Sequence, residues 1–194
     1  MPVRVAKPSD LEAMLSIYAP YVTGTAFSFE YEPPTLTEFT RRFNSITDQF
    51  PWLVWEEQGC VLGYAYCSAH HTRDAYRWCA EVSCYLHPEH RGRGIGRQLY
   101  TALEAILTRQ GYRTVYAVVT TANQSSLAFH KALGYREFAQ FPECGFKLGV
   151  WHGVTWLEKR LNSVEIPSNF PLSAGSIMKN DENFTAILDS LTLS

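Results

Sequence analysis

Apolar and polar side chains alternate through residues 77–86, and a helical repeat of apolar positions follows. The alternate apolar positions of the first segment are Trp78, Ala80, Val82, Cys84 and Leu86. Because side chains alternate between the two faces of a strand, this spacing predicts a strand whose other face carries Glu81, Ser83 and Tyr85. Apolar residues then recur every three or four positions from Leu99 to Leu107. This repeat predicts an amphipathic helix that ends at the C-cap residue Gly111.

The same two periodicities predict the other elements of the chain. Short apolar runs predict strands at residues 3–6, 52–56, 61–67, 114–119, 136–141, 146–148 and 154–159. Helices are predicted to begin at Ser9 and Thr35, each with a glutamate at capping-box spacing, and another is predicted over 125–133. The apolar side of the first helix is expected in the core: Leu11, Met14, Ile17, Tyr18 and Tyr21. We therefore expect an α/β fold with a mixed, strongly twisted sheet and helices on both faces.

An arginine- and glycine-rich turn, Arg91 to Gly96, connects the central strand to its helix. Its glycines permit positive φ angles and let a ligand approach the backbone without meeting a Cβ atom. The helix that follows offers unpaired N–H groups and a positive dipole end to an anion, and Arg91, Arg93 and Arg97 add charge suited to phosphate. The turn has neither the ending of a Walker loop nor the dinucleotide glycine spacing. It predicts a site for another phosphate-bearing cofactor; the alternative is a tight connection with solvated arginines.

Composition and charge narrow the class of protein. A chain of 194 residues with 46% hydrophobic residues is large enough for one well-formed core. A net charge of −2 gives no general basic surface, so we expect neither nucleic acid nor an anionic membrane as partner. The five cysteines include no C-x-x-C pair and are expected to be buried thiols in a reducing compartment. With no signal peptide and no apolar run of membrane-spanning length, these features predict a cytoplasmic protein.

The composition changes at Asn162. Residues 162–194 are rich in serine and asparagine and contain one weakly helical patch, Glu182 to Leu191. We therefore expect one domain over residues 1–161. The segment 162–194 is expected to be a tail that is mobile or packs on a neighbouring subunit.

Glu81 and His130 are the residues that we expect to handle protons. Glu81 lies between Ala80 and Val82, in surroundings expected to be poorly hydrated, and burial makes a carboxylate a better base near neutral pH. The alternative is a glutamate that is simply exposed on the sheet. His130 lies on the helix predicted over 125–133, either as an acid or as a structural hydrogen-bonding residue.

Several separated motifs have the order and spacing of one known family. They are RDAYRW (73–78), EVSCYL (81–86), Arg91-x-x-Gly94-x-Gly96, NQSSL (123–127), FHKALGY (129–135), GFK (145–147), GVWH (149–152) and TW (155–156). Together they resemble the GNAT N-acetyltransferases, and in particular the branch of phosphinothricin and methionine sulfoximine acetyltransferases. The likeness runs from about residue 3 to residue 161 without large gaps. It implies a sheet that is splayed in the middle to admit acetyl-CoA.

The resemblance implies an acetyl-CoA-dependent N-acetyltransferase that works by direct attack in a ternary complex. The acceptor would be the α-amine of a small amino acid or analogue, such as phosphinothricin or methionine sulfoximine. Glu81 matches the family's base and His130 its acid toward the CoA sulfur, and a homodimer is expected. The implied cofactor contacts are Cys84, Tyr85, Leu86, Arg91, Gly92, Arg93, Gly94, Ile95, Gly96, Arg97 and Asn123, with the backbone of 84–86 along the pantetheine arm and one of its amides on the oxyanion. The implied acceptor contacts are Phe29, Tyr31, Arg73, Asp74, Ala75 and Tyr76.

Several alternatives stay open at the level of sequence. The same chemistry would serve a polyamine, an aminoglycoside or a protein N-terminus, although no acidic patch favours a polycation. A non-catalytic acyl-CoA-binding module would bind the cofactor without turnover. We expect no metal, because His70-His71 and His87-x-x-His90 have no third ligand at a recognisable spacing. Cys84 is expected to pack on the apolar strand face rather than to act as a nucleophile.

Overall fold

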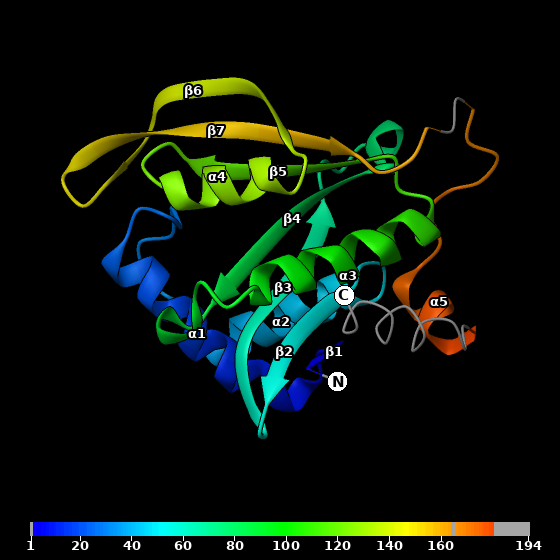
Figure 1. Cartoon of the computed structure of the whole chain (residues 1–194), viewed down its shortest axis with the longest axis horizontal. Coiled ribbons are helices and arrows are strands. Elements are labelled where there is room, and N and C mark those ends of the chain that lie inside the picture. The colour runs from blue at the N-terminus through cyan, green and yellow to red at the C-terminus, as the bar shows by residue number, and fades with distance from the viewer. Residues whose placement is uncertain (1, 164–165, 181–194) are drawn as a thin grey trace.

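One mixed sheet of seven strands forms the centre of the protein, in the order β1-β2-β3-β4-β5-β7-β6. The structure, a computed structural model, describes residues 2–163 and 166–180 (Figure 1). The strands are β1 (Val3–Val5), β2 (Trp52–Glu57), β3 (Cys60–Ala69), β4 (Cys79–Leu86), β5 (Thr114–Thr120), β6 (Arg136–Lys147) and β7 (Val150–Arg160). Only β4 and β5 pair in parallel, and the other neighbours are antiparallel. The predicted α/β fold with a mixed sheet is thereby confirmed.

Helices cover both faces of this sheet, as Figure 1 shows. The helices are α1 (Leu11–Gly24), α2 (Leu36–Thr47), α3 (Ile95–Gln110), α4 (Gln124–Ala132) and α5 (Ala174–Asn180), with short 3₁₀ turns η1 (Pro8–Asp10), η2 (Asp74–Tyr76) and η3 (Pro88–His90). Alternation along β2 and β3 divides the core into two layers. Trp52 and Tyr64 pack with α1 and α2, whereas Leu53 and Ala65 pack with the fully buried leucines of α3. The predicted apolar stripe of the first helix is buried as expected.

The sheet opens between β4 and β5. Their parallel ladder joins only residues 79–81 to residues 114–116, and its last pair is Glu81 with Tyr116. Beyond this pair β4 continues along β3 to Leu86, whereas β5 continues along β7 to Thr120. The two strands therefore diverge toward their C-terminal ends (Figure 1). This is the splayed sheet that the sequence led us to expect.

Local capping signals in the sequence have mixed outcomes. The side chain of Thr35 accepts a hydrogen bond from the Glu38 N–H (3.2 Å) at the start of α2, as predicted. Gly111 ends α3 at φ 95°, also as predicted. The first helix differs from the prediction, because η1 precedes it and the Asp10 carboxylate, rather than Ser9 with Glu12, makes the capping contact by accepting from the Lys7 N–H at 2.7 Å.

The last two strands are longer than predicted. Segments 136–141 and 146–148 were expected as separate strands, but residues 136–147 form one strand, β6, and Leu148 begins the turn to β7. Residues 142–144 form a bulge there, with Glu143 at φ 48°, so the apolar alternation is interrupted while pairing with β7 resumes at Gly145. The strand β7 likewise begins at Val150, four residues before the predicted start.

The described part of the tail packs on its own chain. The Leu172 N–H donates to the Gln110 carbonyl at the end of α3 (2.8 Å). Phe170 lies against Trp78, with 5.3 Å between ring centroids. The predicted helical patch Glu182 to Leu191 lies outside the described residues, and the domain boundary at Asn162 stays a prediction.

Candidate active site

A cavity of about 310 Å³ occupies the space between the diverging strands. Its walls come from β4, β5, the first turn of α3, the helix α4 and the end of α1. The residues that line it are Tyr21, Phe27, Val82, Ser83, Cys84, Tyr85, Leu86, Arg91, Gly96, Tyr100, Ala117, Val118, Val119, Thr120, Asn123, Ser125, Ser126, Phe129 and His130. The cavity has the size and the mainly apolar lining of a small-molecule site.

The edge of β4 offers backbone hydrogen bonds to this cavity. Backbone polar groups alternate between the two edges of a strand, and the His87 N–H bonds to Leu62 in β3 (2.9 Å). The N–H and C=O groups of Val82, Cys84 and Leu86 therefore face the side from which β5 has diverged. Those of Tyr85 face β3, where Tyr64 is its partner. This register corrects one expectation, because Tyr85 lines the cavity without offering its backbone to a ligand there.

Tyr21 makes a contact that sequence reasoning missed. Its hydroxyl donates to the Leu86 carbonyl (2.6 Å) and accepts from the Leu86 N–H (3.1 Å). The helical spacing placed Tyr21 in the core, and the residue is only 9% exposed, but its hydroxyl reaches the open edge of β4. The guanidinium of Arg91 lies over the same ring, 5.0 Å from its centroid. Tyr21 thus links the strand edge to the arginine-rich turn.

The turn before α3 has the backbone that an anion site needs. Gly92 and Gly94 adopt positive φ angles of 76° and 80°, and a Cβ atom on either would meet nothing within 4 Å. Gly96 lies in the first turn of α3, where a Cβ atom would come within 3.3 Å of Phe129. The first and second glycines therefore give the loop its shape, and the third lets α4 pack close to the helix N-terminus.

Six of the predicted cofactor contacts line the cavity: Cys84, Tyr85, Leu86, Arg91, Gly96 and Asn123. Asn123 also caps α4, where its side chain accepts from the Ser126 N–H (3.1 Å). Arg93 instead donates to both carboxylate oxygens of Glu57, at 3.1 and 2.9 Å. The Ile95 side chain is in the core at 1% exposure, and Arg97, Gly92 and Gly94 lie at the surface of the turn. The turn thus presents mainly backbone to a ligand, with Arg91 as the arginine at the cavity.

His130 is buried against the cavity in a defined tautomer. Its Nδ1–H donates to the Ser126 carbonyl (2.8 Å), so its Nε2 accepts from the Tyr100 hydroxyl (2.9 Å) when the ring is neutral. Burial lowers the pKa of His130 from its ordinary value of 6.5, and the Ser126 carbonyl opposes this only in part. Burial likewise keeps the pKa of Tyr100 well above 10.0. Near neutral pH, His130 is therefore neutral and Tyr100 keeps its proton.

Glu81 lies where β4 and β5 separate, one residue before the cavity-lining Val82. Its side chain is 32% exposed, so it is less buried than the sequence suggested. One of its oxygens, Oε1, is 2.9 Å from Nδ1 of His70, which follows the end of β3. Because β3 and β4 pair through Ala69 and Ala80, the sheet register brings these two side chains together. This contact was not visible in the sequence.

The predicted acceptor contacts fall on two surface segments. Arg73 and the residues of η2 are exposed, and the Asp74 carboxylate pairs with Arg77 (2.7 Å). The ring of Tyr76 packs edge-on against His70, with 5.9 Å between centroids. This packing connects η2 to the surroundings of Glu81.

The second segment, the loop after α1, lies against the hairpin of β6 and β7. Phe29 and Tyr31 are 37% and 70% exposed, so both side chains lie at the surface. The Tyr31 hydroxyl donates to the Phe146 carbonyl (2.5 Å). Lys147 is 3% exposed and its ammonium donates to the carbonyls of Val22 and Ser28, at 2.6 Å each. Lys147 thus ties the last turn of α1 and the start of the loop to β6, a role that the sequence did not reveal.

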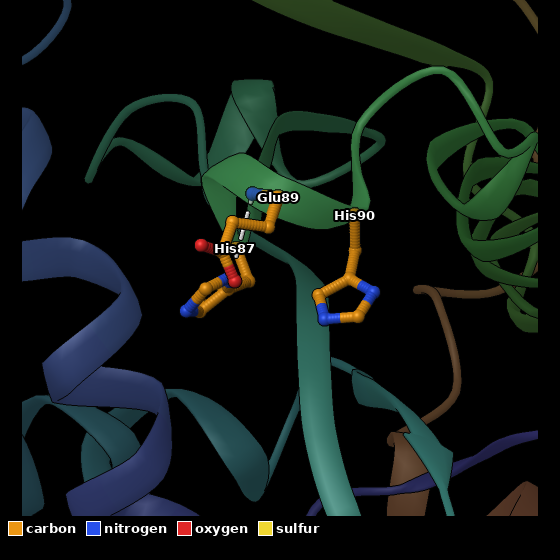
Figure 2. A group of neighbouring side chains, drawn as sticks. All are labelled: His87, Glu89 and His90. Carbon is orange, nitrogen blue, oxygen red and sulfur yellow. Dashed lines mark hydrogen bonds between the residues drawn. The ribbon is translucent and has the colours of Figure 1, made fainter.

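One cluster of metal-ligand residue types lies next to the turn. The side chains of His87, Glu89 and His90 approach within 4.8 Å of one another on η3 (Figure 2). The Nδ1 atom of His87 accepts from the Glu89 N–H (3.4 Å), and Nδ1 of His90 is 2.8 Å from the Arg93 guanidinium, which can only donate. Each neutral ring therefore carries its proton on Nε2, so neither ring presents an unprotonated nitrogen to a metal ion, and the Arg93 guanidinium places a positive charge beside them. We assign no metal to this cluster.

The cysteines have the character expected of structural thiols. All five cysteines are free thiols. Cys67 is buried, but Cys60 and Cys144 are exposed, so the prediction that all five are buried is wrong. Burial raises the pKa of Cys84 to about 12, which disfavours the thiolate that a nucleophile needs. No helix among the described residues combines the length and apolar character of a membrane span.

Comparison with known proteins agrees with this geometry. The profile of the family described as Acetyltransferase (GNAT) domain matches residues 3–156. The phosphinothricin N-acetyltransferase of Alcaligenes faecalis is 39% identical over 83% of this chain and 83% of its own length. The L-methionine sulfoximine/L-methionine sulfone acetyltransferase of Salmonella typhimurium is 36% identical over 61% of this chain and 69% of its own length.

A solved structure has the same fold with the cofactor bound. The crystal structure of a GNAT superfamily phosphinothricin acetyltransferase from Sinorhizobium meliloti in complex with AcCoA has a TM-score of 0.81 to this chain and 37% sequence identity. The match covers 89% of this chain and 94% of that one. The splayed sheet, the glycine turn at a helix N-terminus and the cavity between them fit acetyl-CoA as the cofactor. The chain therefore belongs to the GNAT acetyltransferase family and is an acetyl-CoA-dependent N-acetyltransferase.

Proposed function

We propose that the protein transfers the acetyl group of acetyl-CoA to the α-amine of a small amino acid or analogue of the phosphinothricin and methionine sulfoximine type. The position of Glu81 carries this proposal. It is the last residue of β4 that pairs with β5, at the closed end of the splay, and it directly precedes Val82, which lines the cavity. The relatives that act on phosphinothricin and methionine sulfoximine, by name, support this acceptor class.

In the proposed reaction, Glu81 takes a proton from the acceptor's ammonium, directly or through water. The free amine then attacks the thioester carbonyl carbon, and the C–S bond breaks to release the CoA thiolate. The attacking nitrogen gives up its second proton to solvent or to the departing thiolate, which leaves the neutral amide. The Cys84 N–H is the proposed donor to the oxyanion, because the Leu86 N–H bonds to Tyr21 and the Tyr85 backbone faces β3. The backbone of the turn at Gly92 to Arg97 is proposed to hold the pyrophosphate, and Arg91 adds charge at the cavity.

For the departing thiolate, we propose release without a dedicated acid. His130 is neutral near pH 7 because burial lowers its pKa, and its proton is bonded to the Ser126 carbonyl. The alternative, implied by the resemblance, is proton donation by His130. His130→Asn distinguishes the two, since it should leave turnover within about tenfold of wild type under our proposal and reduce it by about 100-fold or more if His130 is the acid.

The test of the base is Glu81→Gln, which keeps the shape of the side chain and removes its proton-accepting charge. This variant should bind acetyl-CoA as wild type does and lose roughly 10²- to 10⁴-fold in kcat, the usual contribution of a general base. Release of the CoA thiol and acetyl-CoA binding are measured on the same preparation. Unchanged turnover would remove Glu81 from the role.

We also propose a cytoplasmic homodimer. The free thiols are consistent with a reducing compartment. The outer hairpin, at the β6 edge of the sheet, exposes large apolar side chains: Phe138, Phe141, Phe146, Val150 and Trp151. Burial of such a patch against a second copy would remove it from water. Trp151→Glu should shift the mass measured by light scattering from dimer to monomer, and a monomeric wild-type chain would contradict this proposal.

A further inference from the structure

His70 is the partner of Glu81. The contact joins His70 Nδ1 to Glu81 Oε1 at 2.9 Å, and the His70 side chain is 11% exposed. An ionised carboxylate only accepts hydrogen bonds, so Nδ1 carries the proton and donates it. The motifs that carry the family resemblance begin at Arg73, and His70 lies outside them. Its role therefore rests on the structure.

Aromatic side chains fix the imidazole ring in place. It stacks on Tyr116 with 4.4 Å between centroids and an angle of 29° between the planes. Trp156 and Tyr76 contact it edge-on, at 5.7 and 5.9 Å. These three residues come from β5, β7 and η2, so elements on both sides of the splay hold one ring. A ring held this way gives its Nδ1–H a fixed direction.

The neighbour His71 differs in each of these respects. It is exposed, and it contacts Tyr76 and His70 through its ring, at 4.7 and 4.2 Å. Among the described residues, no hydrogen bond joins it to Glu81. The pair His70-His71 therefore has one member directed at the carboxylate and one at the surface, which makes His71 a matched control.

We propose that His70 is a positioning residue for Glu81, an inference that rests on the proposed role of Glu81 as base. By binding Oε1, the imidazole holds the carboxylate in one rotamer and leaves Oε2 for the acceptor's ammonium or for an intervening water. A glutamate side chain that is one third exposed would otherwise sample several rotamers. The hydrogen bond thus holds the Glu81 carboxylate in an orientation suited to proton transfer.

Substitutions at His70 separate the hydrogen bond from the ring. His70→Phe keeps an aromatic ring on Tyr116 and removes the N–H donor. His70→Asn gives up the ring but places an amide nitrogen near the position of Nδ1. We expect His70→Phe to lower kcat roughly 10- to 100-fold, with the KM for acetyl-CoA within about twofold of wild type, since a charge-assisted hydrogen bond is lost. His70→Asn should recover much of this loss, and His71→Phe should match wild type.

A double-mutant cycle with Glu81→Gln shows whether His70 acts through Glu81. When Glu81 is already replaced, His70→Phe should change kcat by less than about twofold. Equal losses in the two backgrounds would overturn the proposal, because they would show a structural role independent of the carboxylate. Wild-type kcat in His70→Phe would overturn it as well.

The same set of variants keeps this inference distinct from the proposed function. If Glu81→Gln turns over as wild type does, the proposed base itself is wrong, whatever His70 does. If Glu81→Gln is inactive and His70→Phe is fully active, only the positioning role fails. Should His70→Phe not fold, His70→Ala with added imidazole replaces it: recovery of turnover on addition of imidazole supports the role, and its absence in a folded His70→Ala variant contradicts it.

Discussion

The glycine turn before α3 permits a sharp test of the cofactor site. Gly94 has φ 80° and is the N-cap of α3, and a Cβ atom added to it meets nothing within 4 Å. Gly59 provides a matched control, because it has φ 79° and equally open surroundings in the turn between β2 and β3. An alanine at either position is strained by about 1–2 kcal/mol in the left-handed region. Both variants should therefore lose a similar free energy of unfolding.

Only Gly94→Ala should also weaken acetyl-CoA binding. Its Cβ atom projects into the open space of the turn, where the pyrophosphate is expected to approach the backbone. Loss of one charge-assisted hydrogen bond costs about 1.5–3 kcal/mol, which corresponds to roughly 10- to 100-fold in affinity. Gly59→Ala should bind acetyl-CoA within about twofold of wild type.

Two measurements on each variant decide the matter. Urea unfolding gives the free energy of unfolding, and calorimetric titration gives the Kd for acetyl-CoA. If Gly94→Ala and Gly59→Ala lose stability equally but bind acetyl-CoA equally well, the turn is a tight connection and not the phosphate site.

Three further predictions concern buried polar groups. The pKa of His130 is lowered from 6.5, so below that pH the unfolded chain binds a proton that the folded protein does not. The stability that a neutral His130 contributes should be complete above about pH 6.5, and the free energy of unfolding should decrease as the pH falls below that value. In urea unfolding, His130→Asn should reduce this pH dependence. Thiol labelling of the native protein should reach the exposed Cys60 and Cys144 but spare Cys84, whose pKa is raised to about 12, whereas all five cysteines react after unfolding. Rapid native labelling of Cys84 would contradict the raised pKa. Lys147→Met leaves two carbonyls without their buried donor and should lower the free energy of unfolding by about 2 kcal/mol or more. The same variant should raise the KM for the acceptor. Unchanged values of both quantities would show that Lys147 does not hold the loop.

Features with a local cause were predictable from the sequence. Alternation revealed β4, the three- and four-residue repeat revealed α3, and glycines at positions 92 and 94 indicated a turn with positive φ. Each depends on residues within one or two elements, where backbone preference and side-chain period act directly. The Thr35 cap belongs to the same class.

Features that depend on register or on distant contacts were not predictable. The contact between His70 and Glu81 depends on the register of β3 and β4, which are joined by a loop. Apolar alternation within each strand does not determine this register, so it could not show that His70, just after β3, lies beside Glu81. Tyr21 belongs to an apolar helical stripe, and only the meeting of α1 with β4 gives its hydroxyl a partner. Lys147 bonds to carbonyls more than a hundred residues earlier, so nothing near it in the sequence marks its burial. The bulge in β6 was interpreted as the end of a strand because it interrupts the apolar alternation. Pairing with β7, which the sequence does not reveal, continues the strand after the bulge.

The most direct measurement is release of the CoA thiol from acetyl-CoA by the wild-type protein and by Glu81→Gln, with a panel of amines. The panel contains phosphinothricin, methionine sulfoximine, methionine sulfone, the common amino acids and a polyamine. We predict saturable turnover by the wild type with one or more of the first three, and little turnover by Glu81→Gln at unchanged acetyl-CoA affinity. Turnover with the polyamine alone would contradict the proposed acceptor class. Bound acetyl-CoA without turnover of any amine would contradict the proposed transfer to amino-acid α-amines.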